Sequence, residues 1–109
     1  MSRDEVKIRH MIDAAKEALS FIKGRSRVDL ESDRQLALSL IKEIEIIGEA
    51  ASKVSGEGQK DNPDVPWDVI VGTRNRLIHG YFDINLDIVW STVTRELPSL
   101  IKELEKIVL

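Results

Sequence analysis

The chain has 109 residues, and its 16 Lys and Arg residues against 19 Asp and Glu residues leave a formal net charge of −3. With 42% hydrophobic and 32% charged residues, its composition is that of a globular protein, and its length predicts a single domain over residues 1–109. The absence of cysteine excludes disulfides, thiol nucleophiles and thiolate metal sites. The mildly acidic balance argues against a surface that tracks nucleic acid along its whole length.

The amino-acid sequence shows no signal for membrane insertion or export. No apolar stretch approaches the roughly 18 residues that a membrane-spanning helix needs. Residues 1–5 lack the apolar core of a secretory signal. We therefore expect a cytoplasmic protein with no membrane partner.

The first half of the chain reads as two helices, because apolar residues recur at helical spacing and no segment alternates with period two. The first helix begins at Ser2 or Asp4 and ends at Gly24, and residues 24–29 form a loop with a small basic cluster. The second helix begins near Ser32 or Asp33. The two main apolar stripes consist of Ile8, Met11, Ile12, Ala15, Leu19 and Ile22, and of Leu36, Leu40, Ile44, Ile47, Ala51 and Val54.

The second helix has apolar residues outside its main stripe. Leu38, Ile41 and Ile46 lie on other faces, so this helix needs more than one neighbour. It is either the central helix of the bundle or a helix that offers a second face to a partner chain, and the pattern does not separate the two. Gly48 weakens the helix and predicts a close helix crossing.

The second half of the chain also reads as two helices, after a connection rich in Gly and Pro over residues 55–66. The third runs from Pro66 to about Ile78 and stops before Gly80, and a short link follows at residues 81–84. Asn85 caps the fourth helix, and Pro98 predicts a kink or a split near residues 94–97. The expected fold is therefore all-α, an antiparallel bundle of four long helices with the last one kinked or split.

The third helix carries an anomaly at Arg74. Its stripe passes through Trp67, Ile70 and Val71, and the next position on that face is a residue that cannot lose its charge. Arg74 must therefore pair with a carboxylate of the second helix or line a cleft that binds an anion. The three candidate partners are Glu43, Glu45 and Glu49.

A histidine and a tyrosine follow Arg74 within eight residues. His79 lies about 140° further round an ideal helix than Arg74, so the two share a face only if the chain turns after the helix ends at Gly80. Each of these residues has an ordinary structural explanation when it is taken alone, since a histidine at a helix C-terminus interacts with the last carbonyls and a tyrosine is usually half-buried.

The order Arg74, four residues, His79, one residue, Tyr81 matches the Arg-x4-His-x-Tyr motif of HepT-like proteins, and the chain resembles this family over essentially its whole length. These proteins are toxins of the HEPN superfamily that occur beside minimal nucleotidyltransferase antitoxins such as MntA. The other matching segments include residues 8–14, 45–51, 66–67 and 87–90.

The resemblance implies a single helical HEPN domain that is typically a homodimer. It also implies a metal-independent endoribonuclease without a cofactor, acting on RNA as the toxin of a type VII toxin–antitoxin pair. By position, Arg74 and His79 would be catalytic and Asn75 would support them. Tyr81 would accept AMP from the cognate nucleotidyltransferase antitoxin, which silences the toxin.

The chemistry of RNA cleavage favours a dimer independently of the resemblance. Cleavage without a metal needs one group to remove the proton of the 2′-hydroxyl, another to protonate the leaving 5′-oxygen, and a cation to stabilise the phosphorane. The motif supplies one histidine, and we expect His10 to pack at the bundle surface without a role. A two-fold dimer brings two copies of Arg74 and His79 to one cleft.

Such a dimer would also concentrate positive charge. We expect Arg74 and Arg76, joined by Arg25 and Arg27, to form a basic cleft on an otherwise acidic body.

Two other functions remain open on the sequence. One is a non-catalytic helical module that binds a nucleotidyltransferase and presents Tyr81 for modification. The other is a nucleotide-binding bundle in which Arg74 holds a phosphate group.

Overall fold

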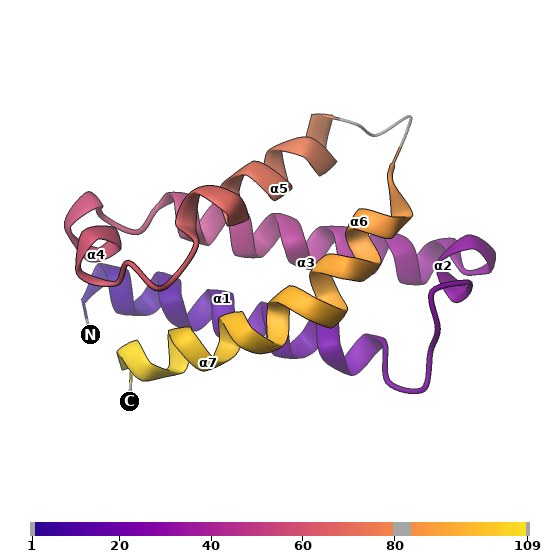
Figure 1. Cartoon of the computed structure of the whole chain (residues 1–109), viewed down its shortest axis with the longest axis horizontal. Helices are drawn as coiled ribbons and strands as arrows, with labels where there is room; N and C mark the ends of the chain where they lie inside the picture. The colour runs from indigo at the N-terminus through magenta and orange to yellow at the C-terminus, as the bar shows by residue number, and fades with distance from the viewer. Residues whose placement is uncertain (1, 80–83, 109) are drawn as a thin grey trace.

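The structure is a computed structural model that describes residues 2–79 and 84–108, without the side chains of residues 78 and 79. Within these ranges every regular element is a helix, so the predicted all-α class is confirmed there. The elements are α1 (Arg3–Phe21), α2 (Asp29–Ser32), α3 (Arg34–Ser52), α4 (Gly56–Asp61), α5 (Trp67–His79), α6 (Leu86–Ser91), the π-helical segment η1 (Thr92–Glu96) and α7 (Leu97–Val108). The helices α1 and α3 lie side by side in opposite directions, whereas α5 and α6 cross this pair obliquely (Figure 1).

The helices α1 and α3 begin where their caps predict. The Ser2 side chain accepts a hydrogen bond from the Glu5 amide at 3.0 Å, and the Asp33 side chain accepts one from the Leu36 amide at 3.0 Å. Gly24, with φ 72°, follows the end of α1 in the left-handed region that glycine enters without strain. Most residues of the two predicted stripes are buried, and they are joined in the core by Ala14, Ala18 and Ala37.

Two short helices were not predicted. The helix α2 follows the expected loop at residues 24–29 and precedes the expected second helix, and α4 lies inside the expected connection at residues 55–66. Each has too few turns to show an apolar period. Side-chain hydrogen bonds hold both: the Asp29 carboxylate accepts from the Ser26 amide at 2.7 Å, and the Ser55 hydroxyl accepts from the Gly58 amide at 2.9 Å. Hydrogen bonds between neighbouring residues therefore stabilise both helices, with a side-chain N-cap at α4 and none at the N-cap Val28 of α2.

The last helical stretch passes through a π turn close to the predicted disruption. Pro98 cannot donate a backbone hydrogen bond, and one turn before it the chain widens into η1, where the Leu97 amide donates to the Thr92 carbonyl. The Thr92 and Thr94 hydroxyls each donate to the carbonyl four residues earlier, both at 2.7 Å. The helix therefore absorbs the proline by a change of hydrogen-bond spacing, and the path continues into α7.

Gly48 sets the distance between α3 and α5. A Cβ atom at this position would collide with the Arg74 Cβ and lie 2.6 Å from the Arg74 Cγ. The close crossing predicted for Gly48 is thus confirmed, because only a residue without a side chain lets the backbone of α5 come this near. At the start of α5, Trp67 is buried and its indole nitrogen donates to the Asn62 carbonyl at 3.0 Å. These two contacts position the helix that carries the motif.

Candidate functional site

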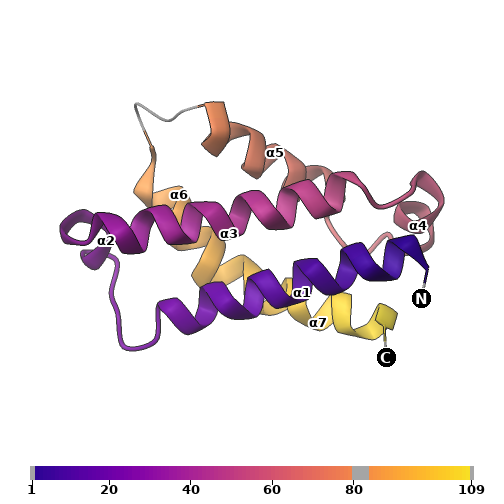
Figure 2. The ribbon, with the colours of Figure 1, turned by 180° about the vertical axis from the view of Figure 1, so that it is seen from behind.

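Arg74 lines a groove of about 420 Å³ that we name the Arg74 groove. It lies over the outer face of α3, which Figure 2 shows in front, with α5 above it and α1 below. Four permanent cations and two carboxylates line it, so the groove carries a positive surplus on a chain whose net charge is −3. Its lining residues are Lys7 and His10 from α1; Lys42, Glu45, Ile46, Glu49, Ala50 and Lys53 from α3; and Arg74 from α5.

The Arg74 side chain is largely buried and ion-paired. Only 14% of it is exposed, and its Nη1 lies 2.7 Å from the Glu49 Oε2. Of the three carboxylates that the sequence offered as partners, Glu49 is the one that α3 turns toward α5. Hydrogen bonds from Lys53 and Arg74 hold the pKa of Glu49 below its usual value, so this carboxylate stays charged at neutral pH.

The pairing with Glu49 leaves part of the guanidinium unused. The Arg74 Nε is buried and has no hydrogen-bond partner within the described residues. The Glu49 carboxylate is itself 52% exposed and is shared with Lys53, whose Nζ lies 3.0 Å from Oε1. Arg74 is therefore held in place by a solvent-facing carboxylate at the edge of a groove, with its buried Nε unpartnered among the described residues.

The other predicted site residues are distributed unevenly. Asn75 and Arg76 are both exposed on α5, and neither lines the Arg74 groove. His79 is the last residue of α5, and its side chain, together with Tyr81, lies outside the described residues. By contrast His10, to which we assigned no role, lines the same groove as Arg74.

The arginines of the first loop do not join Arg74. The Arg25 guanidinium lies 2.8 Å from an Asp33 oxygen, and that of Arg27 lies 2.7 Å from an Asp87 oxygen. Asp33 caps the start of α3, whereas Glu49 lies in its last turns, so the two arginine sites are at opposite ends of this helix. Within one chain Arg25 and Arg27 therefore lie apart from Arg74, each beside a carboxylate, and the basic cleft that we expect in a dimer stays a prediction.

Glu43 is a feature that the sequence reasoning placed wrongly. We considered it as a partner for Arg74, but it is only 4% exposed and its Oε2 has no hydrogen-bond partner within the described residues. Burial and the neighbouring Glu17 raise the pKa of Glu43 to about 7. The burial of Glu43 could have been predicted from the sequence, since this residue follows Leu40 by three positions and precedes Ile44 on the buried face of α3.

The family to which the chain belongs follows from a match over most of its length. The model of the family described as "Ribonuclease HepT-like" matches residues 11–107. The chain belongs to the HepT-like ribonuclease family. Ribonuclease activity is thus supported at the level of the family, and the predicted resemblance is confirmed.

Three relatives of this HepT-like chain span bacteria and archaea. It is 34% identical to "Putative RNase TTE0752" of Caldanaerobacter subterraneus subsp. tengcongensis, covering 92% of this chain and 89% of the relative. It is 32% identical to "Putative RNase MJ1380" of Methanocaldococcus jannaschii, over 96% and 98%. It is 33% identical to "Probable ribonuclease HepT" of Thermococcus cleftensis, over 72% of each chain. No solved structure matches it.

Two features are absent from the described part of this HepT-like chain. No helix in it has the length and apolar character to cross a membrane. No group of three or more His, Cys, Asp or Glu side chains in the same residues is arranged to hold a metal ion.

Proposed function

We propose that the chain is a metal-independent endoribonuclease and the toxin of a toxin–antitoxin pair. The observation that carries this proposal is the position of Arg74, which belongs to the motif on which the sequence resemblance rests and which lies in a groove with a surplus of cations. Such a groove attracts a polyanion such as RNA, because each phosphate is favoured by the local positive potential.

The reaction that fits these residues is a transesterification at a phosphodiester bond of RNA. The 2′-oxygen forms a bond to phosphorus as its proton passes to a base, and the bond to the 5′-oxygen breaks as that oxygen takes up a proton. The products are a 2′,3′-cyclic phosphate and a 5′-hydroxyl. Arg74 stabilises the charge of the phosphorane, and His79 carries one of the protons. Asn75 and Arg76 support the motif from the same helix.

The second proton carrier comes from a second copy of the chain. Leu38 and Ile46 are 44% and 37% exposed on α3, and Ile46 also lines the Arg74 groove. An apolar face beside the groove favours a two-fold contact in which α3 meets its own copy and the two copies of the motif share one cleft. Leu38 and Ile46 would thus meet a partner chain, whereas Ile41 packs against the core of its own chain.

Silencing occurs at Tyr81. In this proposal a partner nucleotidyltransferase activates the phenol oxygen, which attacks the α-phosphorus of ATP. The new bond joins oxygen to phosphorus, pyrophosphate leaves, and the phenol proton passes to a base of the transferase. The attached AMP places an anion and a bulky base beside the motif, where both repulsion and steric block exclude an RNA phosphate.

Cleavage of a defined RNA in the presence of EDTA tests the catalytic assignment. We expect Arg74→Ala and His79→Ala each to slow cleavage by about 10²-fold or more, because each removes a group that acts in the transition state. Arg95→Ala, a change of an exposed arginine on η1, is the matched control and should leave the rate unchanged. Cleavage at the full rate by either motif variant would contradict the assignment. So would a loss of cleavage by the unchanged chain when EDTA removes metal ions.

Sedimentation and mixing test the dimer. Leu38→Asp places a charge on the outer face of α3 and should give an inactive monomer, whereas Val69→Asp, at a residue 56% exposed on α5, should not change the oligomeric state. Mixing an excess of the His79→Ala protein with the unchanged chain should lower the activity of the unchanged chain, because a mixed dimer keeps only one of the two proton carriers. A monomer that cleaves RNA at the full rate would refute the shared cleft.

The ion pair between Arg74 and Glu49 favours a second candidate function, a module that binds a nucleotidyltransferase without cutting RNA. In that case Arg74 only stabilises the fold. Intact mass after expression with a nucleotidyltransferase separates the candidates when it is combined with the cleavage assay. Both predict a mass gain of one or more AMP groups that Tyr81→Phe abolishes, but only the toxin cleaves RNA before modification and stops afterwards.

A further inference from the structure

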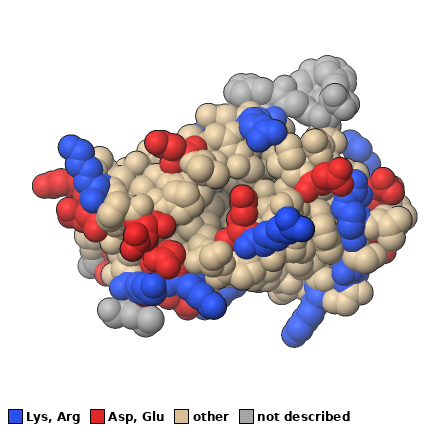
Figure 3. All heavy atoms as spheres, viewed as in Figure 1, with Lys and Arg blue, Asp and Glu red and all other residues tan. Residues whose placement is uncertain are grey.

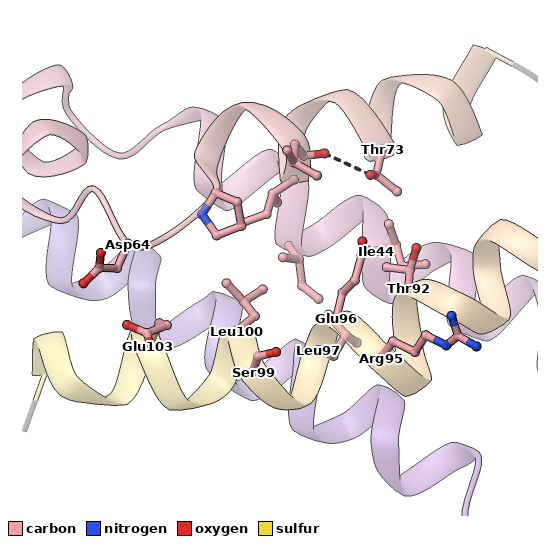
Figure 4. Close-up of a pocket in the computed structure, with 14 residues that line it drawn as sticks. Ile44, Asp64, Thr73, Thr92, Arg95, Glu96, Leu97, Ser99, Leu100 and Glu103 are labelled. Atoms are coloured by element: carbon pink, nitrogen blue, oxygen red, sulfur yellow. Dashed lines mark hydrogen bonds between the residues drawn. The ribbon is translucent and has the colours of Figure 1, made fainter.

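A second groove lies between α5 and the stretch formed by η1 and α7. Its volume is about 400 Å³, and it shares no lining residue with the Arg74 groove. Figure 3 shows the surface hollowed at this place, and Figure 4 shows the side chains that surround it. We name it the α5–α7 groove. The function proposed above makes no use of it.

The floor of the α5–α7 groove is apolar and buried. Ile44 and Ile47 from α3 and Leu97 and Leu100 from α7 line it, and all four are buried parts of the core. At its edge Val69 is 56% exposed, which makes this valine one of the most exposed large apolar side chains in the described residues. A preformed apolar floor with an exposed apolar lip favours the burial of apolar side chains from another molecule.

The rim of the α5–α7 groove is acidic. Asp64 and Glu103 lie at one end, Glu96 reaches across the middle, and the guanidinium of Arg95 points away at the other end (Figure 4). Glu103 has a cation nearby, since the Lys106 Nζ lies 3.2 Å from its Oε1. Within the described residues no ion pair involves Asp64 or Glu96. The rim therefore offers three carboxylates beside an apolar floor.

We propose that the α5–α7 groove binds an amphipathic basic helix of a partner protein. Apolar side chains at helical spacing would lie on the floor, and Lys or Arg side chains on either side would reach Asp64, Glu96 and Glu103. The wall that carries Glu96 is the π segment η1, a kind of turn that is frequent at functional sites. Charge complementarity at the rim selects a basic partner and rejects an acidic one.

The acidic rim disfavours the other occupants. A two-fold contact with a second copy would bring the same three carboxylates opposite themselves, which costs free energy by repulsion. RNA would bring phosphates to the same carboxylates. A basic helix is the occupant whose charges and apolar side chains both match the groove.

Titration of synthetic peptides into the ¹⁵N-labelled chain tests this proposal. The probe is a peptide of about four helical turns with Leu at i, i+3, i+4 and i+7 and Lys on both flanks, and its counterpart has Glu in place of Lys. We expect the Lys peptide to shift the amide signals of Thr73 and Ser99, which line the α5–α7 groove, and not that of Ala50 in the Arg74 groove. The Glu peptide should leave these signals unchanged.

Charge reversal locates the binding surface. The pair Glu96→Lys and Glu103→Lys should weaken binding of the Lys peptide by about tenfold or more, because it replaces attraction by repulsion at two points of the rim. The matched control is Asp13→Lys with Glu57→Lys, two exposed carboxylates elsewhere, and it should bind as the unchanged chain does.

Several results would overturn the proposal. Equal binding of both peptides, or an equal loss in the control pair, would show that the rim does not select the partner. Displacement of the Lys peptide by dodecylammonium at equal concentration would indicate a site for small cationic amphiphiles instead. Self-association that the Glu96→Lys and Glu103→Lys pair abolishes would indicate a second copy. RNA cleavage by this variant pair should be normal, so the outcome is independent of the ribonuclease proposal.

Discussion

Each side of α3 buries one ionisable side chain, and the free-energy cost of burying its charge is offset in a different way on each side. Against α1, Glu43 is 4% exposed, and among the described residues it has no ion pair; burial and its neighbour Glu17 raise its pKa to about 7. Against α5, the Arg74 side chain is 14% exposed and lies 2.7 Å from Glu49. A carboxyl group can lose its charge by taking up a proton, whereas a guanidinium cannot, so only the second contact requires a partner of opposite charge.

The difference gives the two carboxylates opposite dependences on pH. The pKa of Glu43 is raised in the folded chain, so its contribution to stability falls as the pH rises above the usual carboxyl value and levels off above about 7. The pKa of Glu49 is lowered, so its contribution is present at neutral pH and is lost as the pH falls. Substitutions in and around the two contacts test this comparison.

The largest effect is expected at the crossing of α3 and α5. Gly48→Ala should lower the free energy of unfolding by about 2–3 kcal/mol, because the new Cβ meets the Arg74 Cβ and Cγ near the backbone, where neither can move away freely. The control is Gly72→Ala on α5, whose Cβ would meet nothing within 4 Å and which should gain about 0.5–1 kcal/mol from helix propensity. Urea unfolding measures both, and equal effects would contradict the close crossing.

Glu43→Gln tests the contact with α1. The amide cannot ionise, so this variant should lose less stability than the unchanged chain between pH 5 and pH 8, by about 2 kcal/mol. Urea unfolding across this range measures the difference. Exposed Glu57→Gln on α4 is the control and should follow the unchanged chain. A constant offset between Glu43→Gln and the unchanged chain at all pH values would refute a carboxyl group that protonates in the fold.

Glu49→Gln tests the contact with α5 and should have a smaller effect, because this carboxylate is 52% exposed and water screens the pair. At pH 7 the variant should unfold at a lower urea concentration than the unchanged chain, since the Arg74 guanidinium loses its charged partner. The difference should shrink as the pH falls below the usual carboxyl value, because the lowered pKa of Glu49 means that the pair is lost only on acidification. A difference that grows on acidification would be inconsistent with the pair.

An exposed ion pair of similar length should contribute least. Lys16 Nζ lies 3.1 Å from the Glu105 Oε2 between α1 and α7, and both side chains are substantially exposed. Lys16→Ala should change the free energy of unfolding by less than about 0.5 kcal/mol. An effect as large as that of Glu43→Gln would show that the contribution of these contacts to stability does not depend on their burial.

Helix ends were predictable because they depend on neighbouring residues. Ser2, Asp33 and Asn85 cap the helices for which the sequence nominated them, and α5 ends at His79, one residue from the predicted end. The helices α2 and α4 were missed for a different reason, since one or two turns contain too few apolar positions to show a period.

The candidate site was only partly predictable. A break in an apolar stripe pointed to Arg74, and a lone glycine in a helix pointed to the crossing at Gly48. Three carboxylates of α3 were possible partners for Arg74 at that stage. Which of them faces α5 depends on the rotation of one helix against another, and residue spacing along a single helix contains no information about that rotation.

The order of residues along the chain was enough to predict the long helices, their caps and the anomalous charge of Arg74. It was also enough to show the resemblance of the motif to a ribonuclease family. The pairing of Arg74 with Glu49, the burial of Glu43, and the place of His10 beside Arg74 required the packed structure. The physical reason is that backbone hydrogen bonds and caps join residues a few positions apart, whereas burial and charge pairing depend on residues far apart in sequence that meet only when α1 and α5 pack on α3.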